Sequence, residues 1–155
     1  MRSGNLIPAV LAALVLTSAC GDNAPAEGTA SPPVPVPTLD QLPAPFNEAN
    51  LDAGRQAFGK KCSSCHFIDR KKGHMVGPNL NGLFERGPAK ASGYTGYSSA
   101  LKSLGGDTWN PAQLEQWLEH PRVFLPNSNM FFNGIGDADE RRDIIAYLMI
   151  ESRKR

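Results

Sequence analysis

The sequence predicts a small all-α domain that follows a leader and a proline-rich segment. Several stretches carry helix caps or an apolar spacing of three and four residues, which is the period of an amphipathic helix. No stretch reads clearly as a strand. The length of 155 residues suits one domain with additional segments. The formal net charge of +1 gives no support to a nucleic-acid role.

The first 19 residues are predicted to be a signal peptide. An apolar run from Leu6 to Ala19 follows Arg2, and its 14 residues fall short of the ~20 that span a bilayer. The residues Leu16-Thr17-Ser18-Ala19-Cys20 resemble a bacterial lipoprotein signal, which predicts a lipidated N-terminus at Cys20. The alternative is an ordinary signal peptide with an incidental cysteine.

Residues 20–45 are predicted to be a tether. Seven of these 26 residues are proline and no apolar period is visible, which favours an extended polyproline II chain. At about 3.1 Å per residue such a chain reaches roughly 80 Å. The alternative is a disordered leader without a function. The folded domain is expected to span residues 46–155.

Four helices are predicted in this domain. Asn50 caps the first, in which Gly54, Ala57 and Phe58 share a face, and a glycine there suggests a close helix crossing. A short helix is expected at 98–104. The third begins at Asn110-Pro111 and ends before Pro121, and the fourth begins with a capping-box pattern at Asp137 and Glu140. The buried faces of the last two are expected to be Leu114, Trp117 and Leu118, and Ile144, Tyr147 and Leu148.

The motif Cys62-Ser63-Ser64-Cys65-His66 has the C-x-x-C-H spacing of a c-type haem attachment site. Two thiols one turn apart can form thioether bonds with one haem, and the adjacent imidazole can bind its iron. Half of a zinc site and a redox dithiol are the alternatives. No cysteine follows Cys65 to complete a zinc site, and a dithiol enzyme does not need His66.

A bound haem would also explain the long glycine-rich loop and the small hydrophobic core. Residues 67–97 are rich in glycine and lack a helical period, and a loop of this length is usually functional or wrapped around something. About 110 residues with few large apolar side chains make a small core, which haem would complete. The haem-free chain is therefore expected to fold poorly.

Five residues are candidates for the sixth iron ligand, namely His74, Met75, His120, Met130 and Met149. His74 and Met75 follow His66 too closely in the chain to reach the opposite face of the haem easily. Met149 is expected in the core, and His120 at a helix end. Met130 lies in the apolar loop 124–132, and its soft thioether would favour ferrous iron. The sequence therefore favours Met130.

From Leu51 to Met149 the chain resembles class I cytochrome c, of the mitochondrial and soluble bacterial kind. The resemblance rests on the C-x-x-C-H motif and on several further blocks: Gly77-Pro78-Asn79-Leu80, Gly82-Leu83-Phe84, Thr108-Trp109-Asn110, Met130 with Phe132, and Ile144-Ile145-Ala146-Tyr147-Leu148. It implies a small helical class I cytochrome c fold wrapped around one covalent haem c, attached through Cys62 and Cys65.

The resemblance also implies roles for individual residues. His66 and Met130 would ligate the iron, and the Pro78 carbonyl would accept the imidazole N–H. Contact with the buried propionate side is implied for Arg86, Tyr97 and Trp109, and cover of the haem edge for Phe132. Gly54 and Phe58 would pack on Ile144 and Tyr147. Trp117 stands where the family usually has a tyrosine that bonds the methionine sulfur, so the reduction potential is expected to differ.

The function that the resemblance implies is one-electron transfer without catalysis. A quinol–cytochrome c oxidoreductase is the expected donor, and a terminal oxidase or photosynthetic reaction centre the expected acceptor. With the N-terminal signals, the chain is expected to be a monomer anchored by lipid on the periplasmic side of a bacterial membrane, or soluble in the periplasm if Cys20 is not lipidated. From Phe46 onward 15 basic and 12 acidic residues leave a net +3, a weak basis for steering toward an acidic partner. Two alternatives stay open: a haem enzyme or its haem subunit, and a gas-binding sensor.

Overall fold

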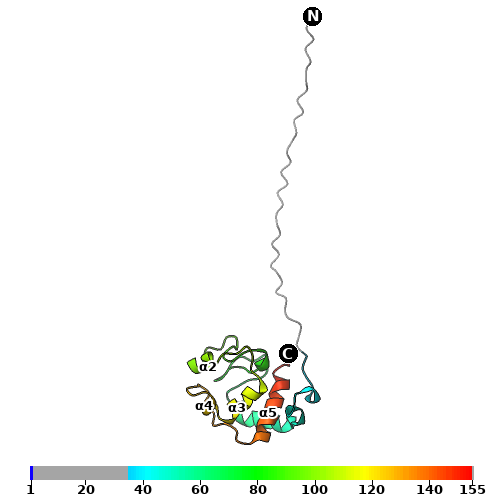
Figure 1. Cartoon of the computed structure of the whole chain (residues 1–155), viewed down its shortest axis with the longest axis vertical. Coiled ribbons are helices and arrows are strands. Elements are labelled where there is room, and N and C mark those ends of the chain that lie inside the picture. The colour runs from blue at the N-terminus through cyan, green and yellow to red at the C-terminus, as the bar shows by residue number, and fades with distance from the viewer. Residues whose placement is uncertain (2–34, 155) are drawn as a thin grey trace. The chain divides into compact units, whose positions relative to one another are not determined.

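The computed structural model describes Met1 and residues 35–154. The predicted signal peptide, the lipidation at Cys20 and most of the tether lie outside these residues. The described chain forms the 3₁₀ turns η1 (Leu39–Gln41), η2 (Phe46–Glu48) and η3 (Leu83–Glu85), and the helices α1 (Leu51–Lys61), α2 (Ser99–Ser103), α3 (Pro111–Glu119), α4 (Pro121–Phe124) and α5 (Ala138–Glu151) (Figure 1). No strand occurs in residues 35–154, and no helix there has the length and hydropathy needed to cross a membrane.

The polar residues expected to cap the helices do so. Asn50 Oδ1 accepts a hydrogen bond from the Ala53 N–H at 3.0 Å, and Asp137 Oδ1 accepts one from the Glu140 N–H at 2.8 Å. Such caps satisfy N–H groups that the first helical turn leaves without partners. The predicted capping box is only half formed, because the Glu140 side chain does not return to the Asp137 N–H; it lies 3.5 Å from Lys61 Nζ and links α5 to α1.

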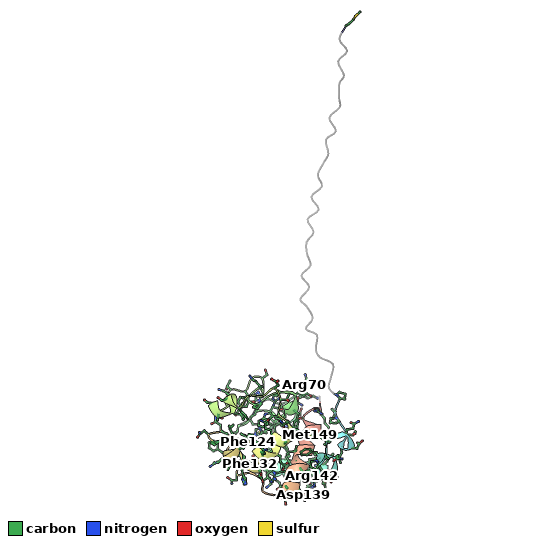
Figure 2. All side chains as sticks on the ribbon, viewed as in Figure 1. Arg70, Phe124, Phe132, Asp139, Arg142 and Met149 are labelled. Atoms are coloured by element: carbon green, nitrogen blue, oxygen red, sulfur yellow. The ribbon has the colours of Figure 1, made fainter. Side chains whose placement is uncertain are left out.

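The crossing of α1 and α5 is the largest contact between helices in the described chain. A Cβ atom at Gly54 would lie 3.1 Å from Tyr147 Cβ, and the Phe58 and Tyr147 rings pack with centroids 5.6 Å apart. The predicted close crossing is therefore confirmed. Met149, labelled in Figure 2, is buried on α5, as expected for a core residue. With it the core holds Ile144, Ile145, Ala146 and Leu148 of α5, Leu114, Trp117 and Leu118 of α3, Ala57 and Phe58 of α1, and Leu83, Trp109 and Ile135.

The folded domain begins earlier than the boundary expected at residue 46. Leu42 and Phe46 are 5% and 7% exposed and belong to the core, and η2 contacts α5. The Asn50 N–H donates to Asp143 Oδ1 of α5 at 2.9 Å, which ties this entry segment to the last helix. Apolar side chains set between prolines therefore dock on the domain, although they show no periodic pattern in the sequence.

Helix α4 was not expected from the sequence. Pro121 ends α3, as predicted, but it also occupies the first position of the next turn. A proline suits that position because its fixed φ is helical and the N–H it lacks would have no helical partner there. The apolar loop that carries Met130 therefore starts at Leu125.

Candidate haem site

One cavity of about 280 Å³ brings the motif and the distant candidate residues together. Residues from the turn after α1, the loop 76–98, helices α3 and α5 and the loop 128–132 line it. Its lining includes every residue that the sequence assigned to haem: Cys62, Cys65, His66, Pro78, Arg86, Tyr97, Trp109, Met130 and Phe132. Apolar side chains form much of the remaining wall: Leu80, Leu83, Leu101, Leu114, Leu118, Ile144 and Leu148.

The two cysteines lie in one tight turn at the end of α1. The N–H groups of Cys65 and His66 both donate to the Cys62 carbonyl, at 3.0 and 2.9 Å, which keeps the turn closed. Neither cysteine is in a disulfide. Burial raises the pKa of the Cys62 thiol to about 11, so this group is a protonated thiol at neutral pH. Two thiols in one turn are the groups that would add across the two vinyl groups of a haem to form thioether bonds.

The His66 imidazole has a fixed orientation. Its Nδ1 lies 2.7 Å from the Pro78 carbonyl oxygen, and because a carbonyl only accepts, Nδ1 carries the proton and donates. The implied hydrogen bond is therefore present. Nε2 keeps its lone pair and is the nitrogen available to a metal. Burial lowers the pKa of His66, against the opposite effect of the Pro78 bond, so the ring is neutral.

Gly77 makes room for this ring. A Cβ atom at position 77 would lie 2.2 Å from His66 Cε1 and 2.8 Å from Nε2, far inside van der Waals contact. The Gly77 N–H donates to the Cys65 carbonyl at 2.9 Å, which draws the loop onto the cysteine turn. The glycine in the Gly77-Pro78 block therefore has a steric reason to be there.

Among the five candidates for the sixth ligand, Met130 is the one that lines the cavity. Its sulfur accepts a hydrogen bond from Trp117 Nε1 at 3.1 Å. Both ring nitrogens of His74 are engaged elsewhere, since Nδ1 accepts from the Asn79 N–H and Nε2 lies 2.9 Å from the Ser92 carbonyl. His120 is exposed at the end of α3, and Met149 is in the core.

All three residues for which the resemblance implied contact with the propionates, Arg86, Tyr97 and Trp109, line the cavity. The Arg86 guanidinium donates to the carbonyls of Asn79, at 2.6 Å, and Asn81, and the Arg86 carbonyl accepts from the Trp109 N–H at 3.0 Å. Burial lowers the pKa of Arg86, but the group stays cationic at neutral pH. No carboxylate in residues 35–154 forms an ion pair with it. A cation at an apolar cavity suits an anionic group of the occupant.

Ser128 was missed by the sequence reasoning. Its Oγ is buried without a hydrogen-bond partner among the described residues, and the residue lines the cavity. A buried hydroxyl without a partner is costly, which indicates that the occupant supplies one. No signal in the sequence marks this serine among its Asn and Pro neighbours. An apolar cavity with two thiols, an imidazole nitrogen, a thioether and polar groups for carboxylates fits haem.

The zinc alternative finds no support in the described chain. No group of three or more His, Cys, Asp or Glu side chains is arranged to hold a metal ion in residues 35–154. A structural zinc site usually needs four such ligands. The cysteine pair and His66 instead face the apolar cavity.

Comparison with known proteins agrees with this geometry. The cytochrome c family matches residues 51–150. Cytochrome c of Cannabis sativa is 40% identical over 108 residues, which cover 68% of this chain and 96% of the relative. Cytochrome c of Chlamydomonas reinhardtii is 39% identical over 111 residues, covering 72% and 94%. The solved structure of cytochrome cH from Methylobacterium extorquens superposes with a TM-score of 0.58 at 39% identity, over 64% of this chain and 97% of that one.

The family match covers the C-x-x-C-H motif, the loop 67–97, Met130 and helix α5 as far as Ile150, all of which contribute residues to the cavity. It begins at Leu51 and does not include the N-terminal residues before it. The chain therefore belongs to the cytochrome c family, as an electron-transfer protein with a covalently bound haem c rather than an enzyme.

Proposed function

We propose that this protein is a membrane-tethered one-electron carrier whose iron is bound by His66 Nε2 and the Met130 sulfur. The observation that carries the proposal is that both atoms belong to residues lining one apolar cavity, and that each is held by a neighbour, Pro78 or Trp117. Haem supplies an iron that gains and loses one electron. The chain holds two ligands in place and excludes water, so little rearranges when the charge changes.

A haem enzyme or gas sensor would need an open iron position. The Met130 side chain lines the cavity and accepts a hydrogen bond from Trp117 Nε1, which favours the carrier. The test is the absorption spectrum of the purified holoprotein. A carrier gives a low-spin, six-coordinate spectrum that carbon monoxide leaves unchanged, and Met130→Ala should make the iron accessible to carbon monoxide. Ready binding by the wild-type protein at neutral pH would overturn the proposal.

We also propose export and lipid attachment at Cys20, on the periplasmic side of a bacterial membrane. Since Leu39 packs against the core, the proposed tether would extend from Cys20 to about Thr38, a length of roughly 60 Å for an extended chain at about 3.1 Å per residue. Mass spectrometry of the mature protein would report signal cleavage, acyl groups and haem together. Cys20→Ser should release the holoprotein from membranes. A mature wild-type protein without acyl mass would contradict the anchor and leave a soluble periplasmic carrier.

The proposed partners are a quinol–cytochrome c oxidoreductase as donor and a terminal oxidase or photosynthetic reaction centre as acceptor. The side chains of Phe131 and Val76 are 86% and 76% exposed and also line the cavity, so they mark where electrons can leave the domain. The Arg122 guanidinium lies 5.9 Å from the Phe131 ring centroid and adds a positive charge. We infer that partners dock there through apolar contact with a weak electrostatic contribution.

Kinetics with purified complexes would test this docking face. Phe131→Ala should slow reduction by the quinol–cytochrome c oxidoreductase at low protein concentration. Val123→Ala is the matched control, because Val123 is 78% exposed but does not line the cavity. The rate should fall only modestly between low and physiological salt, since few charges are involved. Equal effects of the two substitutions would contradict docking at the cavity.

A further inference from the structure

The residues that precede α1 are built into the folded domain. Leu42, Phe46 and Ala49 are all buried and belong to the core. We call residues 39–50 the strap. The family match begins at Leu51, so the strap lies outside it. A segment that buries three apolar side chains is an integral part of the domain, because each of them stabilises the folded state by leaving water.

Helix α5 carries buried apolar side chains on opposite faces. Ile144 and Leu148 line the cavity, and at about 100° per residue Ala146 points roughly the opposite way. Ala146 is nevertheless 0% exposed, and Met149 is buried as well. A helix with apolar side chains on opposite faces has to be covered on both. Helices α1 and α3 pack against α5, and so does the η2 turn, so the strap completes the cover of this helix.

A hydrogen bond fixes the place where the strap meets α5. The Asn50 N–H donates to Asp143 Oδ1 at 2.9 Å. Around the helix axis, Asp143 lies roughly 120° away from the midpoint of Ile144 and Leu148, the pair that lines the cavity. At the other end of the strap, η1 contacts η2, and Leu39 packs against the core. The strap is therefore held from Leu39 to Asn50 on a side of α5 that does not face the cavity.

The strap and the cavity mouth lie on different sides of α5. The cavity mouth is the side on which Val76 and Phe131 both line the cavity and are exposed. Among the described residues that line the cavity, none belongs to the strap. Figure 1 shows the entering chain, in cyan, beside α5 at one edge of the domain, and α4, which precedes the Met130 loop, near another edge. Seen from the cavity, the chain therefore enters the domain behind α5.

We propose that the strap makes a membrane anchor leave the domain behind α5, so that the cavity mouth stays free for redox partners. The inference rests on the proposed lipid anchor and docking face. Tethering raises the effective concentration of a carrier near its partner only where the geometry lets both attachments form at once. A chain that left the domain beside the mouth would have to be displaced or ordered when a partner docks, which costs binding free energy. The strap avoids that cost by directing the chain to the other side.

Amide hydrogen exchange on the full-length holoprotein tests whether the strap is docked. In the wild type the Asn50 N–H should exchange slowly, because it is bonded to Asp143 beneath a packed segment. Phe46→Ser should speed this exchange by about tenfold or more, as expected when an aromatic side chain is no longer buried. Asn47→Ser is the matched control, since Asn47 is exposed on the same η2 turn and should leave the exchange rate unchanged. Fast exchange in the wild type would overturn the proposal, whether or not the Phe46→Ser variant folds.

A bulky group on the strap tests which side it occupies. In holoprotein with Cys20→Ser no free thiol remains, because Cys62 and Cys65 are joined to haem. A cysteine introduced by Asn47→Cys or Val76→Cys can then carry either a long polyethylene glycol chain or a small iodoacetamide cap as its reference. The polymer at position 76 should slow reduction by the quinol–cytochrome c oxidoreductase by about tenfold or more, since it blocks the docking orientation. At position 47 it should change the rate by less than about twofold, because that orientation stays open.

The outcomes separate this inference from the proposed function. If the oxidoreductase does not reduce even the capped proteins, the proposed partner fails and the inference fails with it. If it reduces them, and the polymer at position 47 slows reduction as much as the polymer at position 76, only the inference is overturned. A mature wild-type protein without acyl mass at Cys20 would remove the anchor and the inference about it, and would leave the carrier in place.

Discussion

A Cβ atom at Gly54 would lie 2.1 Å from the carbonyl oxygen of Asp143, so α1 and α5 touch backbone to backbone at this point. The contact brings together residues 89 positions apart. It also positions the haem site, because α1 runs directly into the Cys62 turn and α5 supplies Ile144 and Leu148 to the cavity wall.

Gly54→Ala should destabilise the holoprotein by about 2 kcal/mol or more, because the backbone of α5 cannot move away cheaply. Gly59→Ala is the matched control on the same helix, since a Cβ atom there meets nothing within 4 Å. It should stabilise the protein by up to about 1 kcal/mol through helix propensity. Denaturant unfolding measures both, and a similar effect of the two substitutions would exclude a steric origin.

Gly77→Ala should disturb the imidazole rather than the fold as a whole. The new methyl group would overlap the His66 ring, which must tilt or lose its bond to Pro78. We expect an altered electron paramagnetic resonance spectrum of the ferric state, with a lower potential as the ligand geometry relaxes. Gly73→Ala is the control, because nothing lies within 4 Å of a Cβ atom at that position. An unchanged spectrum for Gly77→Ala would contradict this prediction, because it would mean that the loop 76–98 can shift to make room for the methyl group.

Arg141→Met should cost about 3 kcal/mol in stability. The Arg141 side chain is 7% exposed and pairs with Glu115 at 2.8 Å and Glu119 at 3.4 Å. Its Nη1 also donates at 2.7 Å to the carbonyl of Ile135, a residue that is 2% exposed, so the substitution leaves a buried acceptor without a partner.

Arg55→Met is the comparison for Arg141, because Arg55 forms an exposed pair with Asp52 on α1. It should change stability by no more than about 0.5 kcal/mol. Chemical denaturation of the two holoproteins gives both values. A loss for Arg141→Met as small as that for Arg55→Met would mean that the buried network contributes little.

Stability of the holoprotein should fall as the pH drops below about 6.5, because burial lowers the pKa of His66 from 6.5, with the Pro78 bond acting in the opposite direction, and the proposed bond from Nε2 to iron would also keep a proton off the ring. In this window the unfolded chain binds a proton at His66 and the folded domain does not, so unfolding takes up protons and is favoured by acid. The stability that comes from the unprotonated His66 ring is fully present above pH 6.5. Its loss levels off once the pH is below the pKa of His66 in the folded protein. Unfolding temperatures between about pH 7.5 and 5.5 measure it.

His120→Asn is the comparison for the pH series, since it replaces an exposed histidine at the end of α3 and leaves His66 in place. A stability that rises as the pH falls through this window would contradict the assignment to His66.

Without haem the domain should lose most of its ordered structure. An unfilled cavity of about 280 Å³ costs roughly 7 kcal/mol at ~24 cal/mol per Å³, which is comparable to the whole stability of a small domain. The double variant Cys62→Ser, Cys65→Ser, purified without haem, should therefore give a weaker helical circular dichroism signal and no cooperative thermal transition. A haem-free chain with full helicity and a sharp transition would overturn this prediction.

Local sequence patterns were sufficient to predict much of the fold and of the candidate haem site. The C-x-x-C-H spacing identified the attachment turn, and Asn50, Asn110 and Asp137 marked the helix starts, because a cap involves residues three apart. Gly54 predicted the helix crossing, since a glycine inside a helix needs a reason that sequence neighbours do not give. Met130 followed from the composition of its loop.

Other features depended on contacts between distant parts of the chain. The docking of Leu42 on the core, the Trp117 bond to the Met130 sulfur and the unpartnered hydroxyl of Ser128 leave no periodic pattern in the sequence. The sequence by itself determined which residues can bond haem and where helices begin, because those are short-range chemistry. Only the tertiary structure decided which candidate ligand side chains line the cavity and which form hydrogen bonds to backbone carbonyls instead. Burial and hydrogen-bond partners are set by residues that packing brings together from distant parts of the chain.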